Sequence, residues 1–152
     1  MSIPSLFSLE NRTALVTGGT RGIGAQMAIA LAEAGADVIL VQVPFPSSHA
    51  LCKDSTNAIW KRDTSNQQTK QTIESLGRKA FIYTADLSSR EDVSGLTKKV
   101  LADGHDISIL ITCAGIQRRH PAEKFPDSDW DEVSTNPPIG RMNGFFFIGF
   151  LS

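Results

Sequence analysis

The sequence contains few of the residues that bind metals or form disulfides, with only two cysteines and three histidines among its 152 residues. Cys52 and Cys113 lie far apart with no secretory leader before them, so we expect reduced thiols and a cytoplasmic protein. His49, His105 and His120 are scattered and match no metal-ligand spacing. The composition therefore argues against a disulfide framework and predicts no metal site.

The sequence also lacks a strong charge of either sign and a long hydrophobic run. The net charge is -1 and 41% of the residues are hydrophobic, which predicts one domain with a real core. This charge gives no electrostatic basis for binding nucleic acid or a membrane. The most apolar stretch, residues 145–151, is far shorter than the ~20 residues of a transmembrane helix. We interpret it as a poorly folded tail with a tendency to β-aggregation.

What the sequence does contain is a glycine-rich turn, residues 17–24, after an apolar run, 13–16, that predicts a buried strand. Beyond the turn, a helical pattern runs to Gly35, which can close a helix in the left-handed conformation. Glycines let a backbone approach a pyrophosphate, and the helix N-terminus adds partial positive charge. The turn therefore predicts dinucleotide binding, with an ordinary strand-to-helix loop as the alternative. The apolar helical positions are Ile23, Met27, Ala30, Leu31 and Ala34.

The rest of the chain alternates between strand and helix patterns. Further apolar runs predict three more strands, at residues 37–42, 80–84 and 107–112. Residues 65–76 are compatible with a helix that Gly77 ends, and Ser88 with Glu91 has the spacing of a capping box. The helix after that box would present an apolar face of Val93, Leu96, Val100 and Leu101. Strands separated by helices predict an α/β fold with a parallel, doubly wound sheet.

Two segments interrupt this alternation. Residues 43–61 contain two prolines and paired serines, show no period, and would form an unusually long connection inside a domain. Later, Asn136-Pro137-Pro138 would stop the helix that begins near Ser128. We therefore expect a dinucleotide-binding part at 1–133, a foreign insertion at 43–61 and a foreign apolar tail at 134–152. Retained introns in the gene would explain both foreign segments, and this is a hypothesis.

Three short motifs follow one another in a characteristic order. Thr17, Gly18, Gly22 and Gly24 form Thr-Gly-x-x-x-Gly-x-Gly, Ala85-Asp86-Leu87 follows the third expected strand, and Cys113-Ala114-Gly115 follows the fourth. With these motifs the chain resembles the short-chain dehydrogenase/reductase family over residues 7–133, apart from 43–61. The resemblance implies the N-terminal part of a Rossmann-type doubly wound parallel sheet, truncated after about four strands. It also implies an NAD(P)-dependent oxidoreductase that transfers hydride on a secondary alcohol or ketone.

The resemblance places a dinucleotide site at these motifs. Main-chain groups of the turn would hold the adenosine and pyrophosphate, and Gly24 would permit close helix packing. Asp86 would accept a hydrogen bond from the adenine amine, although a solvated aspartate beside a helix is the alternative. Cys113 replaces the family's asparagine, so only backbone contacts are carried over there. The implied cofactor-binding residues are Gly18, Thr20, Arg21, Gly22, Ile23, Gly24, Asp86, Leu87, Cys113, Ala114 and Gly115.

The choice between NAD and NADP normally depends on the end of the second strand. An acid there favours the ribose 2′-hydroxyl of NAD, and a nearby arginine favours the 2′-phosphate of NADP. Gln42 is neither, while Arg21 could help to bind a phosphate. The cofactor is therefore expected to be NAD or NADP, with NAD slightly preferred.

The family's catalytic residues have no counterpart in this sequence. The family uses a Tyr-x-x-x-Lys pair with an upstream serine, in which the lysine and the cofactor lower the pKa of the tyrosine. The single tyrosine, Tyr83, has Leu87 four residues later and belongs to an expected strand. The family's helix asparagine also has no match, because Asn136 stands one residue early. A catalytically inactive nucleotide-binding or interaction fragment and an unstable translation product are therefore the alternatives to an enzyme.

Two segments bear on the substrate of a full-length parent. Residues 114–119 and 129–133 are most similar to 2-deoxy-D-gluconate 3-dehydrogenases, with other sugar-acid and 3-oxoacyl reductases as alternatives. Arg118 and Arg119 could face the carboxylate of a sugar acid, or they could be a solvated basic pair. The expected partner is thus a small-molecule substrate such as a sugar acid, without nucleic acid or membrane. We do not expect this chain to form the family's oligomer.

Overall fold

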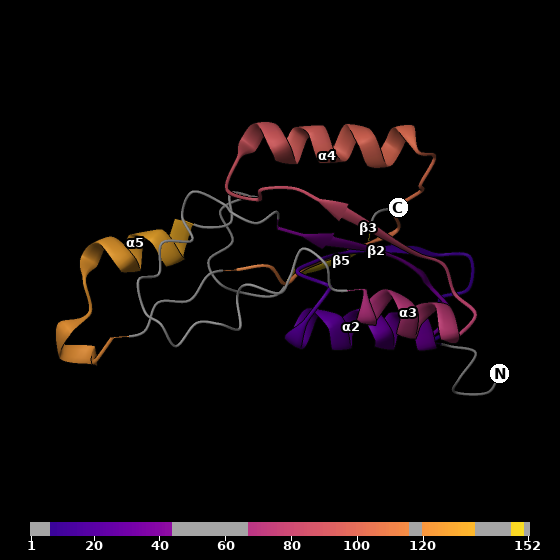
Figure 1. Ribbon diagram of the computed structural model, residues 1–152, viewed down its shortest axis with the longest axis horizontal. Coiled ribbons are helices and arrows are strands. Elements are labelled where there is room, and N and C mark those ends of the chain that lie inside the picture. Colours follow the sequence, from indigo (N-terminus) through magenta and orange to yellow (C-terminus); the bar gives the residue numbers. More distant parts are fainter. Residues whose placement is uncertain (1–6, 44–66, 116–119, 136–146, 151–152) are drawn as a thin grey trace.

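A computed structural model describes residues 7–43, 67–115, 120–135 and 147–150 of the chain. Its centre is a five-stranded sheet in the order β3-β2-β1-β4-β5 (Figure 1). The strands are β1 (Thr13–Thr17), β2 (Asp37–Gln42), β3 (Ala80–Thr84), β4 (Ile109–Thr112) and β5 (Phe147–Phe150). The pairs β1–β2, β2–β3 and β1–β4 are all parallel, which confirms the predicted doubly wound sheet.

Helices cover both faces of the sheet. The helices are α2 (Gly22–Glu33), α3 (Gln68–Ser75), α4 (Arg90–Ala102) and α5 (Asp127–Thr135), with a 3₁₀ turn, η2, at Ala122–Lys124. In Figure 1, α2 and α3 lie side by side on one face and α4 lies on the opposite face. The two layers of core that result are built around Val16 and Leu40 on the first face and around Ile39 and Val41 on the second. This is the layering expected of strands that are buried on both sides.

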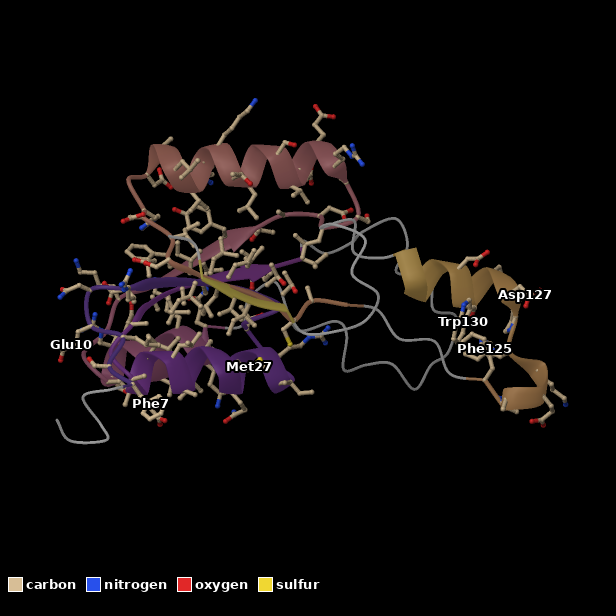
Figure 2. The ribbon with its side chains drawn as sticks, turned by 180° about the vertical axis from the view of Figure 1, so that it is seen from behind. Phe7, Glu10, Met27, Phe125, Asp127 and Trp130 are labelled. Carbon is tan, nitrogen blue, oxygen red and sulfur yellow. The ribbon has the colours of Figure 1, made fainter. Side chains whose placement is uncertain are left out.

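Helix α5 lies to one side of the sheet and does not cover either face (Figures 1 and 2). It is held to the preceding turn by local contacts: His120 Nε2 lies 2.8 Å from Asp129 Oδ2, and the ring of Phe125 packs edge-on against Trp130. The Trp130 side chain is largely exposed. The helix ends at Thr135, just before the Asn136-Pro137-Pro138 sequence that was predicted to stop it.

Strand β5 was not predicted from the sequence. Four residues of the segment interpreted as a poorly folded tail pair antiparallel with β4, in a register that joins Ile109 to Phe150 and Thr112 to Phe147. An open strand edge offers unpaired N–H and C=O groups, and an apolar stretch without charge or proline can pair with them. Residues 136–146 and residues 44–61 of the predicted insertion at 43–61 lie outside the described residues.

Helix α2 packs on the sheet with a stripe that only partly matches the predicted one. The fully buried positions are Gly24, Ala25, Ala28 and Ala32. Of the predicted positions, Met27 and Leu31 are half-buried against the core, whereas Ile23 is 62% exposed. Small side chains allow the helix axis to approach the strands closely, and this approach outweighs the extra apolar area of the larger residues. Gly35 closes the helix at φ 106°, as predicted.

Helix α4 also differs from its prediction in two details. The capping residue is Ser89, whose hydroxyl accepts a hydrogen bond from Asp92 N at 3.2 Å, and not Ser88. Leu101 is 60% exposed, so it does not belong to the buried face. Leu96 and Val100 are buried as predicted. The change of cap shifts the start of the helix by one residue, which is the usual uncertainty at the end of a helix.

Candidate cofactor site

The candidate site lies at the carboxyl ends of the parallel strands. The chain passes from β1 to β2 and β3 on one side, and then returns to place β4 on the other side of β1. In doubly wound sheets, the crevice at such a reversal of strand order is where ligands bind. The glycine-rich turn follows β1 and the Cys113-Ala114-Gly115 turn follows β4, so both predicted motifs lie at this crevice.

The glycines of the first turn are required by its geometry. Gly18 has φ 67° and Gly22 has φ 53°, a region that side-chain-bearing residues rarely adopt. A Cβ on Gly24 would overlap the carbonyl oxygen of Gly18, so α2 can only begin this close to the turn with glycine there. A Cβ on Gly19 would lie 2.8 Å from Leu40 Cδ2 and 3.0 Å from Val16 O. The turn is therefore packed tightly against the core on its inner side.

The outer side of the turn is open. A Cβ built on Gly22 would meet no described atom within 4 Å, in contrast to Gly18, Gly19 and Gly24. Arg21 is the N-cap of α2 in an extended conformation, and its side chain makes no capping hydrogen bond to the helix. The first N–H groups of a helix have no partner within the helix, and together with the helix dipole they favour an anion. These features fit the pyrophosphate of a dinucleotide.

Thr17 locks the two turns together. Its Oγ1 accepts hydrogen bonds from Cys113 N at 3.1 Å and from Ala114 N at 3.2 Å, and its side chain is buried. A Cβ on Gly18 would lie 3.1 Å from Ala114 Cα, which shows how closely the turns approach. The sequence placed Thr17 in the motif but did not identify it as a site residue. Its position as the last residue of β1 was the available signal.

The ends of β2 and β3 are joined by further hydrogen bonds. Gly18 N donates to Val41 O at 2.8 Å, and Ala85 N donates to Gln42 O at 3.0 Å. Gln42 Nε2 donates to Thr84 Oγ1 at 3.3 Å, and the glutamine side chain is buried. The residue at the end of β2 is thus a neutral amide directed toward β3, so the site has no carboxylate at this position to bind a ribose hydroxyl.

Asp86 and Leu87 follow β3 at the same edge of the sheet. Asp86 Oδ1 accepts hydrogen bonds from Ser88 N at 2.9 Å and Ser88 Oγ at 2.6 Å, so one carboxylate oxygen shapes the loop before α4. Leu87 is only 3% exposed and belongs to the core on the α4 face. Its side chain therefore cannot reach a ligand, which leaves its main chain as the predicted contact.

The remaining predicted residues fall into two groups. Thr20 is buried, while Ile23 and Gly115 are exposed at the edge of the crevice. Cys113 is a half-buried free cysteine whose pKa is raised by burial, so the thiol stays protonated and is a poor nucleophile. Arg118 and Arg119 lie outside the described residues. The structure thus brings together the first and last motifs through Thr17, and it places Asp86 on the same sheet edge beyond β2.

Tyr83 lies elsewhere, on the α4 side of β3. It is 8% exposed, and its hydroxyl donates a hydrogen bond to Asp103 Oδ2 at 2.6 Å. Burial, followed by this hydrogen bond and the negative charge of Asp103, raises the pKa of Tyr83 to about 12. A catalytic tyrosine of the family needs a lowered pKa, so this environment acts in the wrong direction. The interpretation of Tyr83 as a buried strand residue is confirmed.

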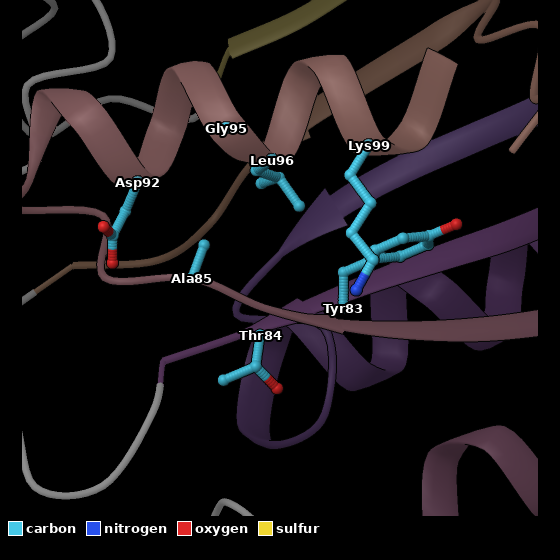
Figure 3. A pocket seen from close by; sticks show the side chains of 7 residues that line it. All are labelled: Tyr83, Thr84, Ala85, Asp92, Gly95, Leu96 and Lys99. Atoms are coloured by element: carbon cyan, nitrogen blue, oxygen red, sulfur yellow. The ribbon is translucent and has the colours of Figure 1, made fainter. Parts of the chain in front are cut away.

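A hollow of about 230 Å³ opens beside Tyr83, between β3 and α4 (Figure 3). It is lined by Tyr83, Thr84, Ala85, Asp92, Gly95, Leu96 and Lys99. Lys99 Nζ lies 5.6 Å from the centre of the Tyr83 ring, over its face. The hollow therefore contains a tyrosine and a lysine, which are the residue types of the family's catalytic pair. Their contacts differ from that pair, because the Lys99 ammonium group lies over the Tyr83 ring and the Tyr83 hydroxyl donates to Asp103.

The described residues offer neither a metal site nor a membrane-spanning helix. Within residues 7–43, 67–115, 120–135 and 147–150, no three His, Cys, Asp or Glu side chains gather closely enough to hold a metal ion. Across the same ranges, no helix combines the length and apolar character that crossing a membrane requires.

Comparison with known proteins identifies the family of this chain. The sequence model of the KR domain family matches residues 12–137. Gluconate 5-dehydrogenase of Gluconobacter oxydans is 37% identical over 150 residues, which cover 98% of this chain and 50% of that protein. The 2-dehydro-3-deoxy-D-gluconate 5-dehydrogenase of Escherichia coli is 33% identical over 131 residues, 86% of this chain and 44% of that protein.

A solved structure shows the same fold. A 3-oxoacyl-(acyl-carrier-protein) reductase of Agrobacterium tumefaciens with NADP bound is 29% identical, with a TM-score of 0.66 over 93% of this chain and 47% of that one. The chain spans half or less of the length of each of these three relatives. The family match and the shared fold together identify the chain as a member of the KR domain family of short-chain dehydrogenases/reductases.

Proposed function

We propose that this chain is the cofactor-binding part of an NAD(P)-dependent oxidoreductase that transfers hydride on a secondary alcohol or ketone of a sugar acid. The observation that carries the proposal is the pair of turns at the reversal of strand order, joined by the two hydrogen bonds to Thr17. This arrangement fixes the main chain on both sides of the crevice. The cofactor would supply the hydride donor or acceptor at its nicotinamide ring.

The chain's own residues would bind and orient the cofactor. Main-chain groups around Gly18 and from Thr20 to Ile23 would face the adenosine and pyrophosphate, because α2 begins there with an open side at Gly22. Gly24 would allow α2 to begin against Gly18. Main-chain groups of Cys113, Ala114 and Gly115 would line the opposite wall, and Asp86 with Leu87 would lie toward the adenine.

For the cofactor, NAD is the preferred proposal. The buried amide of Gln42 carries no charge, so it would neither repel a 2′-phosphate nor bind the ribose diol as a carboxylate does. Arg21, at the mouth of the turn, would favour NADP. The two sugar-acid dehydrogenase relatives support a gluconate-type substrate, and the 2-deoxy-D-gluconate 3-dehydrogenase resemblance agrees with that class.

The division of the chain into parts is proposed on the same basis. Strand β2 ends at Gln42 and α3 begins at Gln68, which leaves a connection much longer than the two to six residues usual between such elements. We propose that residues 43–61 are an insertion foreign to the family and that 134–152 form a foreign tail. Transcript reads that run continuously through both segments would contradict an origin in retained introns.

A second candidate function is a nucleotide-binding or interaction protein without catalytic activity. The observation in its favour is that the single tyrosine is bound to Asp103 and has a raised pKa. A dehydrogenase assay of the full chain with gluconate and either cofactor tests this second candidate. We expect no turnover from the chain as it stands, because the catalytic pair of the family is missing, and turnover would contradict the second candidate.

Calorimetric titration of the full chain with NAD and with NADP tests the binding site itself. Gly22→Ala should lower the affinity tenfold or more, because its methyl group would project into the open side of the turn at φ 53°. Gly77→Ala is the matched control, since Gly77 also has a positive φ of 78° and open space around it but lies at the end of α3. Both substitutions should cost about 1–2 kcal/mol of stability. Equal affinities for the two variants would contradict the proposed site.

A further inference from the structure

Helix α3 is attached to the back of the glycine-rich turn by a buried hydrogen bond. Thr69 Oγ1 donates to the carbonyl oxygen of Thr20 at 3.1 Å, and the two residues are 4% and 1% exposed. Thr69 lies in the first turn of α3, which runs beside α2 under the same face of the sheet (Figure 1). The bond therefore connects the turn to a helix that lies 49 residues further along the chain.

The direction of this bond controls the direction of a neighbouring amide. A trans peptide unit is planar and its C=O and N–H groups point to opposite sides. When Thr69 holds the Thr20 carbonyl toward α3, the N–H group of Arg21 in the same peptide plane must point away from α3. Arg21 is the N-cap of α2, so this N–H group belongs to the set of main-chain donors at the mouth of the turn.

We propose that Thr69 is a positioning residue for the cofactor turn. It fixes the peptide plane between Thr20 and Arg21, so that the Arg21 amide is directed toward the dinucleotide before the ligand arrives. The inference rests on the proposed function for its ligand, but the orientation of the peptide plane is a property of the free chain. Preorganised donors bind more tightly because the ordering cost is met during folding.

Helix α3 has other attachments that would survive the loss of this hydroxyl. Ile73 is fully buried in the core between α2, α3 and the sheet. Just after the helix ends, the chain is tied to the start of β2. Arg78 Nη2 lies 3.0 Å from Asp37 Oδ1, and the same oxygen accepts a hydrogen bond from Lys79 N. Removal of the Thr69 hydroxyl should therefore leave α3 docked and change the turn locally.

The experiment compares three variants of the full chain. Thr69→Val removes the hydroxyl and keeps the shape of the side chain, whereas Thr69→Ser retains the hydroxyl and removes only the methyl group. Thr72→Val is the matched control, because the Thr72 hydroxyl donates within α3 to Gln68 O and not to the turn. We expect Thr69→Val to weaken NAD binding about tenfold in calorimetry, while Thr69→Ser and Thr72→Val bind within about twofold of the wild type.

A second measurement uses the chain without cofactor. In ¹⁵N–¹H spectra, the Arg21 and Gly22 amide signals should move in Thr69→Val and stay in place in Thr72→Val. Unchanged Arg21 and Gly22 signals in Thr69→Val, or wild-type affinity in that variant, would overturn the role of Thr69. A wild-type chain that binds neither NAD nor NADP would instead overturn the proposed function, and the amide spectra would still decide whether Thr69 orients the turn.

Discussion

Two regions of this molecule contain the residue types of a dehydrogenase site, and they differ in how those residues are held. The first is the crevice between the turns after β1 and β4, where Thr17 Oγ1 accepts two partly buried hydrogen bonds that fix main-chain N–H groups of the second turn. The second is the hollow between β3 and α4, where Tyr83 and Lys99 lie together (Figure 3). By residue type alone, the hollow looks more like a catalytic centre than the crevice does.

The environments reverse that impression. In the crevice, glycines with positive φ and the N-terminus of α2, which has no side-chain capping hydrogen bond, provide a setting that favours an anion. In the hollow, the tyrosine hydroxyl donates to Asp103, and the resulting pKa of about 12 keeps it protonated at neutral pH. The difference teaches that function depends on what the neighbouring groups do to a side chain, and three experiments can test it.

The largest effect is expected from alanine at two helical glycines, one in each region. Gly24→Ala should lower the free energy of unfolding by about 3 kcal/mol, because its Cβ would overlap the backbone of Gly18, which cannot move aside as a flexible side chain could. Gly95 lines the hollow, and a Cβ built on it meets no described atom within 4 Å. Gly95→Ala should therefore raise the free energy of unfolding by about 0.5–1 kcal/mol. Urea denaturation measures the free energy of unfolding of both variants. Changes of the same sign would contradict the difference proposed between the crevice and the hollow.

A smaller effect is expected when the hydrogen bonds of each region are removed. Thr17→Val should cost about 2 kcal/mol and abolish detectable NAD binding, because the amides of Cys113 and Ala114 lose their buried acceptor. Thr17→Ser, which keeps the hydroxyl, serves as the control and should bind NAD. Tyr83→Phe should cost about 1 kcal/mol and leave binding unchanged. Loss of binding in Tyr83→Phe would show that the hollow takes part in the site.

The smallest effect is confined to high pH. The pKa of Tyr83 is raised from 10.0 to about 12 on folding, so between these values the unfolded chain loses a proton that the folded chain keeps. The stabilising contribution should therefore be complete below about pH 10 and decline as the pH rises toward 12. Tyr83 is the single tyrosine, so the tyrosinate absorbance reports it alone. A folded-state midpoint at or below 10 would contradict the raised pKa, and Tyr83→Phe provides the blank.

The helices and strands were predictable where residues such as glycine marked their ends in the sequence. Strands β2 and β3 occur at the predicted residues, because each apolar run is preceded by a glycine that ends a helix. Strand β4 begins at Ile109, two residues later than predicted, and α3 begins at Gln68, where the polar sequence gave no sharp start. The motif residues of the crevice were identified from their order along the chain, and the structure places the first and last motifs side by side.

The contacts that hold the crevice together could not be read from the sequence. Thr17 binds residues 96 and 97 positions away, and Thr69 binds a carbonyl 49 positions away. Threonine at such positions is equally consistent with strand or helix packing, so its residue type carries no signal for these bonds. The face of α2 was also ambiguous, because a stripe of larger residues and a stripe of small ones run along the same helix.

Periodicity and spacing along the chain were enough to predict the alternation of strands and helices, the glycine-rich turn and the family. Three other features became visible only in the folded chain: the residues of α2 that are fully buried against the sheet, the pairing of β5 with β4, and the hydrogen bond between Tyr83 and Asp103. These depend on the shape and polarity of groups that come together only after folding. The motifs of the candidate cofactor site are thus found in local sequence, while hydrogen bonds between residues distant in sequence hold its turns together.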